Sequence, residues 1–118
     1  MNQKAEFPDL PGIDLEAGLN VVRGNTELYT RLLIKFADSY VDFDEQFGSA
    51  QNEDDSDAAR RSAHSLKGVA GNLGATQLAE AAFELEKACA ENSTELDSKR
   101  TAVNNELQKV LQGVELLR

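Results

Sequence analysis

The distribution of proline is the strongest constraint on how this chain can fold. The 118 residues contain two prolines, Pro8 and Pro11, so residues 12–118 have none. This long stretch is rich in Ala, Leu, Glu and Lys, which favour helices, whereas an internal proline would interrupt one. It contains neither a period-two run of β-branched residues nor an Asn-Gly or Asp-Gly hairpin signal. The sequence therefore predicts an all-α fold.

Start and stop signals divide this stretch into five predicted helices, which span about residues 14–23, 26–47, 57–73, 76–90 and 94–117. The boundaries are set by residues that cap or end helices, by an acidic stretch that suits a helix N-terminus, and by a capping-box spacing. In chain order these signals are Gly24, Asn25, Gly48, then Asp54, Asp55 and Asp57, the Asn72–Gly74 break, and the pair Thr94 and Asp97.

The four long predicted helices carry apolar residues at alternating spacings of three and four, as amphipathic helices do. In the second helix this seam consists of Tyr29, Leu33, Phe36, Tyr40, Phe43 and Phe47. Because the loops are short, we predict an antiparallel four-helix bundle with the short first helix packed across one end. The bundle domain is expected over residues 13–118, and residues 1–12 are expected to be a flexible lead-in or linker.

The charge and the cysteine content narrow the function classes. A net charge of −9 argues against nucleic acids and anionic membrane surfaces as partners, although solubility alone also explains an acidic surface. One cysteine, Cys89, rules out a disulfide framework within the chain. No apolar run approaches the ~20 residues that span a bilayer, and the N-terminus has no apolar signal-peptide core. We therefore expect a cytoplasmic protein.

The predicted third helix presents two different faces. Its core stripe consists of Ala59, Ala63, Leu66, Ala70 and Leu73. A second stripe, formed by His64, Lys67, Gly68 and Gly71, points roughly 140° away from it at ~100° per residue. Each glycine in a helix interior costs roughly 1 kcal/mol relative to alanine. Without side chains at these glycines, another protein could approach the imidazole of His64 closely. For Gly71, the alternative explanation is fraying of the helix toward the Asn72–Gly74 break.

His64 is the only histidine in the chain. It has no second histidine or cysteine at ligand spacing, so no metal site is expected, and no serine or cysteine nucleophile that it could activate is evident. A neutral imidazole can itself act as a nucleophile toward phosphorus. Lys67, one turn away, could then neutralise a phosphoryl group on His64. For His64 and Lys67 taken singly, an ordinary surface role is the simpler explanation.

The predicted fourth helix could support the imidazole. Reflecting His64 through the centre of the helical hairpin, near Gly74–Ala75, gives a position near Leu85–Glu86. A hydrogen bond from the far ring nitrogen to Glu86 would fix the tautomer and leave the other nitrogen free to attack. An unrelated surface glutamate is an equally good explanation at this stage.

Residues 63–86 resemble the signature of histidine-containing phosphotransfer (Hpt) domains. That signature is a histidine, two intervening residues, Lys-Gly, a further glycine, and Leu-Glu on the next helix. Here these are His64, Lys67–Gly68, Gly74 and Leu85–Glu86. The segments LPGIDLEAGL and GNTELYTRLLIKFADSY also resemble the beginning of such domains, so the likeness covers about residues 10–117.

The resemblance implies a four-helix bundle in which His64 exchanges a phosphoryl group with aspartates on receiver domains of response regulators or hybrid histidine kinases. Such modules are relay intermediates rather than self-contained enzymes, and no Walker-type or kinase-like glycine loop is present here. No cofactor is expected on this chain, because the Mg²⁺ used in transfer would sit in the receiver. In many family members a glutamine supports the histidine, so Glu86 departs from that pattern.

Two other interpretations remain open at this stage. The chain could be a non-catalytic acidic adaptor, for which His64 would be dispensable. It could also be the histidine-bearing domain of a chemotaxis-type kinase, which would precede an ATP-binding domain in a longer chain.

Overall fold

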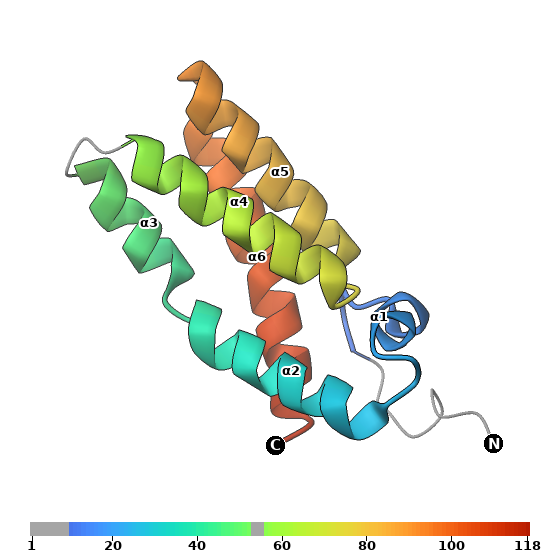
Figure 1. Cartoon of the computed structure of the whole chain (residues 1–118). Helices are drawn as coiled ribbons and strands as arrows, with labels where there is room; N and C mark the ends of the chain where they lie inside the picture. The colour runs from blue at the N-terminus through green and yellow to red at the C-terminus, as the bar shows by residue number, and fades with distance from the viewer. Residues whose placement is uncertain (1–9, 53–55) are drawn as a thin grey trace.

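The computed structural model describes residues 10–52 and 56–118, which form six α-helices (Figure 1). In chain order the helices are α1 (Leu15–Val21), α2 (Thr26–Tyr40), α3 (Phe43–Asn52), α4 (Ser56–Asn72), α5 (Thr76–Glu91) and α6 (Leu96–Glu115). No strand occurs within these ranges. The α4–α5 hairpin packs on α6, while α3 contacts α4 and α2 contacts α6. The predicted all-α four-helix bundle with a short additional N-terminal helix is confirmed.

The segment predicted as one helix over residues 26–47 is two helices, α2 and α3, with a turn at Val41 and Asp42 between them. The apolar seam nevertheless runs through the turn. Its aromatic rings follow one another in contact, Phe36 with Tyr40, Tyr40 with Phe43, and Phe43 with Phe47. The periodicity therefore identified the buried face correctly, although it gave no sign of the break.

Gly48 does not end a helix, contrary to the prediction, because α3 continues to Asn52. A Cβ atom at Gly48 would lie 2.8 Å from the guanidinium of Arg100 on α6. That guanidinium donates hydrogen bonds to the side chains of Asp44 and Gln51 and lies over the Phe47 ring. The glycine therefore makes room for an arginine that ties α3 to α6, a contact between segments far apart in the sequence.

Helix α1 lies across the end of the bundle, against the turn that joins α4 to α5 (Figure 1). The amide of Asp14 donates to the carbonyl of Gly74 in that turn, and the Tyr29 hydroxyl donates to the carbonyl of Leu73. Gly74 adopts a φ of 85°, a conformation that favours glycine. Burial, with a smaller contribution from the Asp14 charge, raises the pKa of Tyr29 to about 12. These hydrogen bonds attach α1 and α2 to the turn that follows α4.

Gly18 of α1 fits closely against the same turn, which leads to a stability prediction. A Cβ atom there would lie 2.6 Å from the Leu73 carbonyl oxygen and would also collide with the Tyr29 hydroxyl. We expect Gly18→Ala to lower the free energy of unfolding by about 1–3 kcal/mol, because a backbone atom cannot move aside cheaply. Urea denaturation measures this. Gly68→Ala is the matched control, because no atom lies within 4 Å of its Cβ position and it should be neutral or stabilising. Equal stabilities of the two variants would contradict the prediction.

The predicted helix caps are partly confirmed. Asn25 caps α2 by accepting a hydrogen bond from the Leu28 amide at 3.0 Å, and Gly24 has a positive φ after α1. The Thr94–Asp97 capping box is wrong, because the N-cap of α6 is Glu95 and no side chain caps that helix. Instead, the hydroxyl of Ser93 accepts from the Glu95 amide within the preceding turn.

Most of the predicted lead-in, residues 1–9, lies outside the described residues, as do Asp54 and Asp55. The last residues of the lead-in pack on the bundle. Leu10 is 3% exposed, and Leu10 and Pro11 both lie against Gly113 on α6. Leu10 and Pro11, which the sequence placed in the lead-in, therefore pack against the bundle.

Candidate functional site

His64 lies in the middle of α4 and faces solvent. Its side chain is 61% exposed. The predicted core stripe of the same helix is buried throughout, at Ala59, Ala63, Leu66, Ala70 and Leu73. The two faces predicted for this helix are therefore present, and His64 is on the one directed away from the core.

Glu86 on α5 contacts the imidazole, as the reflection through the hairpin turn predicted. The distance from His64 Nδ1 to Glu86 Oε2 is 2.7 Å. The other carboxylate oxygen, Oε1, lies 3.0 Å from Lys67 Nζ. A single carboxylate, 16% exposed, thus connects the histidine and the lysine.

The charge of Glu86 determines which ring nitrogen is free. Burial opposes ionisation of this carboxyl, but the hydrogen bonds and charges of Lys67 and His64 outweigh burial and lower its pKa. An ionised carboxylate only accepts hydrogen bonds, so Nδ1 of His64 must be the donor. In the neutral imidazole, Nε2 then carries the lone pair. In that tautomer the nitrogen with the free lone pair is therefore Nε2, on a side chain that is 61% exposed.

Lys67 is held on the α5 side of the histidine. Besides its ion pair with Glu86, its ammonium lies 5.4 Å from the centroid of the Phe83 ring. Phe83 is itself 47% exposed. Phe83 belongs to none of the motifs in the sequence, and the one signal that could have identified it is its position one turn before Glu86 on the same helix.

The two glycines of the stripe are exposed and are not required by packing. A Cβ atom at Gly68 would meet nothing within 4 Å, and one at Gly71 would make only an ordinary contact with Ala79 at 3.9 Å. Gly74 is different, because its φ is positive and a Cβ atom would collide with the Asp14 carbonyl. Gly68 and Gly71 thus leave the surface beside His64 open, whereas Gly74 serves the fold.

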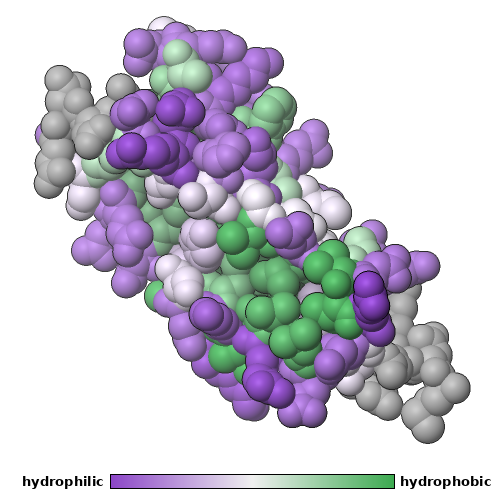
Figure 2. All heavy atoms as spheres, in the orientation of Figure 1, coloured by the Kyte–Doolittle hydropathy of each residue, from purple (hydrophilic) through white to green (hydrophobic). Residues whose placement is uncertain are grey.

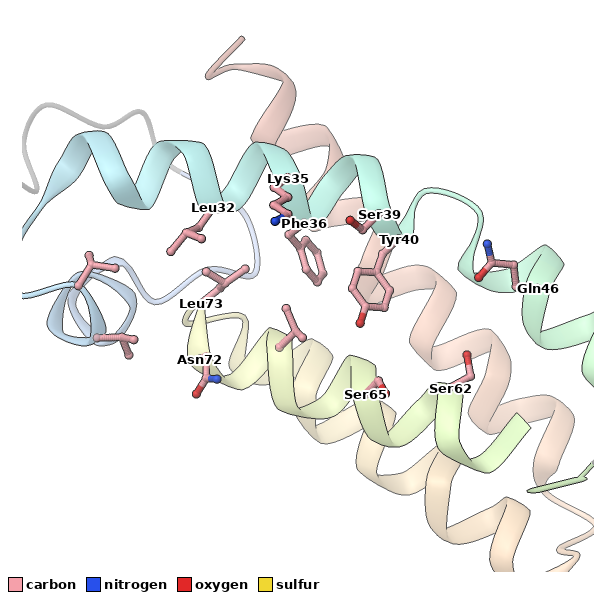
Figure 3. A pocket seen from close by; sticks show the side chains of 13 residues that line it. Leu32, Lys35, Phe36, Ser39, Tyr40, Gln46, Ser62, Ser65, Asn72 and Leu73 are labelled. Carbon is pink, nitrogen blue, oxygen red and sulfur yellow. The ribbon is translucent and has the colours of Figure 1, made fainter. Parts of the chain in front are cut away.

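An apolar groove runs along the other side of the histidine. It has a volume of about 740 Å³ and lies between α1, α2 and α4 (Figure 3). Its apolar lining consists of Val21, Val22, Leu32, Phe36, Tyr40, Val69 and Leu73. Figure 2 shows hydrophobic side chains gathered on this face, where α1, α2 and the C-terminal half of α4 meet. Ser65, the residue after His64, also lines the groove, so the groove and the histidine adjoin each other on α4.

Within residues 10–52 and 56–118, no three His, Cys, Asp or Glu side chains gather closely enough to hold a metal ion. In the same ranges, no helix is long and apolar enough to cross a membrane.

Comparison with known families decides the identity of the fold. The family model described as the Hpt domain matches residues 31–115, which is well over half of the chain. The chain belongs to the Hpt domain family. An Hpt domain is a histidine phosphotransfer module of two-component phosphorelays, in which it works with receiver domains and carries the phosphoryl group as an intermediate.

The fold of this Hpt domain also matches a solved structure. An HPT domain from the Hpt sensor hybrid histidine kinase of Shewanella superposes with a TM-score of 0.77 at 21% sequence identity, covering 92% of this chain and 94% of the other. At this identity the match supports the fold. No curated protein matches the chain significantly. The resemblance predicted from the sequence is therefore confirmed, while the roles of the individual site residues stay predictions.

Proposed function

We propose that His64 is the phosphoryl-accepting residue of this Hpt domain and that Nε2 is the reacting atom. The observation that carries this proposal is the contact between His64 Nδ1 and Glu86, which in the neutral imidazole places the proton on Nδ1 and the lone pair on Nε2 of a side chain that is 61% exposed. The chain has a single histidine, so a histidine phosphotransfer module of this sequence has one candidate. The domain is a relay component rather than a self-contained enzyme, and its partners are receiver domains.

The proposed step conserves atoms and charge. The lone pair of Nε2 attacks the phosphorus of an aspartyl phosphate on the receiver, and the P–O bond to the aspartate breaks. The aspartate leaves as a carboxylate with the bonding electron pair. The imidazole keeps its proton on Nδ1 and becomes a positively charged ring bearing the phosphoryl group. Transfer to another receiver is the reverse of this step.

Glu86 and Lys67 stabilise opposite charges that this step creates. The ring becomes positive, and the carboxylate of Glu86 already accepts its Nδ1 hydrogen bond. The phosphoryl group brings about two negative charges, and Lys67 lies one helical turn away from His64. No cofactor is proposed on this chain. The Mg²⁺ that assists transfer would be bound by the receiver, where it would stabilise charge on the phosphoryl oxygens.

The groove beside His64 is the surface on which we place the receiver. Transfer requires the receiver's aspartate to reach Nε2, so the docked partner must cover the exposed strip of α4 that contains His64 and Gly68. The apolar groove adjoins that strip through Ser65 and Val69 and offers hydrophobic area for a partner to bury.

The single cysteine, Cys89, is free and buried, which is compatible with the reducing cytoplasm in which we place this exchange.

The test is a transfer assay against a panel of phosphorylated receiver domains from one organism. We expect at least one receiver to label the protein, and we expect the label to be lost in acid and retained in alkali, as a phosphorus–nitrogen bond is. Absence of label from every receiver, or a label with the opposite stability, would contradict the proposal.

Glu86→Gln separates the charge of this side chain from its hydrogen bond. The amide oxygen can still accept from Nδ1, but the compensating negative charge is lost. We expect single-turnover transfer to His64 to slow about tenfold, the difference between a charge-assisted and a neutral hydrogen bond. Glu84→Gln is the matched control, because Glu84 is on the same helix and lies 3.9 Å from Lys99 instead. If both variants transfer at the wild-type rate, Glu86 has no part in the chemistry.

A further inference from the structure

Phe83 is a large apolar side chain exposed beside the phosphoryl-accepting histidine, and the mechanism above does not use it. Its ring is 47% exposed, and the Lys67 ammonium lies 5.4 Å from its centroid. That distance is within the range of a cation–π interaction. The ring thus has a specific partner in the site rather than being an isolated surface phenylalanine.

In the unphosphorylated protein, Lys67 has two partners on α5. Its ammonium pairs with Glu86 Oε1 at 3.0 Å and faces the Phe83 ring. We call this arrangement of Glu86 and Phe83 the lysine seat. A phosphoryl group on Nε2 would bring about two negative charges onto the neighbouring turn of α4. Lys67 would have to give up contacts in the seat to bind that group.

Contacts that exist in one state only shift the equilibrium toward that state. The seat holds Lys67 while His64 is unphosphorylated, so it opposes accumulation of the phosphorylated form. The same contacts therefore make the phosphoryl group easier to pass on. This argument rests on the proposed function of His64 and Lys67.

We propose that Phe83 is a positioning residue that holds Lys67 in the lysine seat and thereby sets the phosphotransfer equilibrium between this Hpt domain and its receiver. Phosphorylation draws Lys67 off the ring, and dephosphorylation returns it. Phe83 acts through Lys67 and does not touch the reacting atoms.

The first experiment follows Lys67 directly by NMR. The whole protein is treated with phosphoramidate, from which Nε2 displaces ammonia at phosphorus, so that the P–N bond of the donor is replaced by a P–Nε2 bond. Phosphorus NMR reports the extent of phosphorylation. In the resting protein we expect the Lys67 Cε protons to be shifted upfield by the Phe83 ring current. On phosphorylation they should move toward ordinary lysine positions.

The second experiment measures the equilibrium constant for exchange with a receiver that phosphorylates the wild type. Phe83→Leu removes the ring and should shift the equilibrium about two- to fivefold toward the phosphorylated Hpt domain. Phe83→Trp, which offers a better ring for a cation, should shift it the other way, and Phe83→Tyr should resemble the wild type. In a Lys67→Ala background, Phe83→Leu should have no further effect on the equilibrium.

These results distinguish two failures. If neither phosphoramidate nor any receiver phosphorylates the protein, the proposed function fails. If the protein is phosphorylated but the Lys67 protons keep their ring-current shift, the lysine seat is not released and this inference is wrong. An unchanged equilibrium in Phe83→Leu, or an equal effect of that change in the Lys67→Ala background, also overturns it.

Discussion

Replacing His64 with glutamine should abolish phosphoryl transfer while leaving the bundle folded. Glutamine has a similar length and an amide group that can still donate to Glu86, but it has no ring nitrogen with a lone pair for attack on phosphorus. Because the His64 side chain is 61% exposed and packs in no core layer, the free energy of unfolding should change by no more than about 0.5 kcal/mol. Transfer of radioactive phosphate from a phosphorylated receiver and a urea melt measure the two quantities.

The control for this experiment is Asn105→Gln, an exposed position on α6 that is outside the site. It should accept phosphate at the wild-type rate. If His64→Gln accepts as much acid-labile label as this control, the acceptor is another residue. That outcome would contradict the proposed role of His64.

Gly68→Gln should stabilise the protein and at the same time block transfer. No atom lies within 4 Å of the position of a Cβ at Gly68, so the new side chain meets no clash. Gln is a better helix former than Gly, so the free energy of unfolding should rise by about 0.5–1 kcal/mol. The same side chain would stand one helical turn from His64, where the receiver must approach. A displacement of the reacting groups by about 1 Å lowers transfer on the order of 100-fold.

Opposite effects on stability and transfer make this prediction specific. Gly68→Ala adds helix propensity with little bulk, so it should gain most of the stability and lose little of the transfer rate. Binding of a receiver whose aspartate cannot be phosphorylated, measured alongside transfer, shows whether docking or chemistry is affected. Normal transfer in Gly68→Gln would mean that the glycine is tolerated at this position rather than needed.

The parts of this Hpt domain that could be predicted from the sequence depend on local periodicity. The core stripe of α4 and the outward direction of His64 follow from 3.6 residues per turn alone. The His64–Glu86 contact was predictable because the short turn at Gly74 fixes the register of the α4–α5 hairpin, so that one position can be reflected onto the other.

The parts that could not be predicted depend on contacts between distant segments. The α2–α3 turn lies within an unbroken apolar seam, and Gly48 had the usual appearance of a helix terminator. Its actual role follows from Arg100, which comes from the other end of the chain. The groove could not be predicted from the sequence for the same reason. Apolar residues of α1 and α2 cannot be assigned to core or surface before the positions of the helices are known. Gly68 and Gly71 were already distinguished from Gly74 by their place on the outward stripe of the helix, and the Cβ positions agree with that distinction.

Much of the groove lies on helices other than the one that carries the histidine, and this affects how relay pathways can diverge. The proposed chemistry is confined to one hairpin, α4–α5, which carries His64, Lys67 and Glu86. Much of the proposed docking wall comes instead from α1 and α2. After gene duplication, substitutions on α1 and α2 can therefore insulate one relay from another while the hairpin stays unchanged. Exchanging these two helices between related domains is accordingly the direct route to rewiring a signalling pathway.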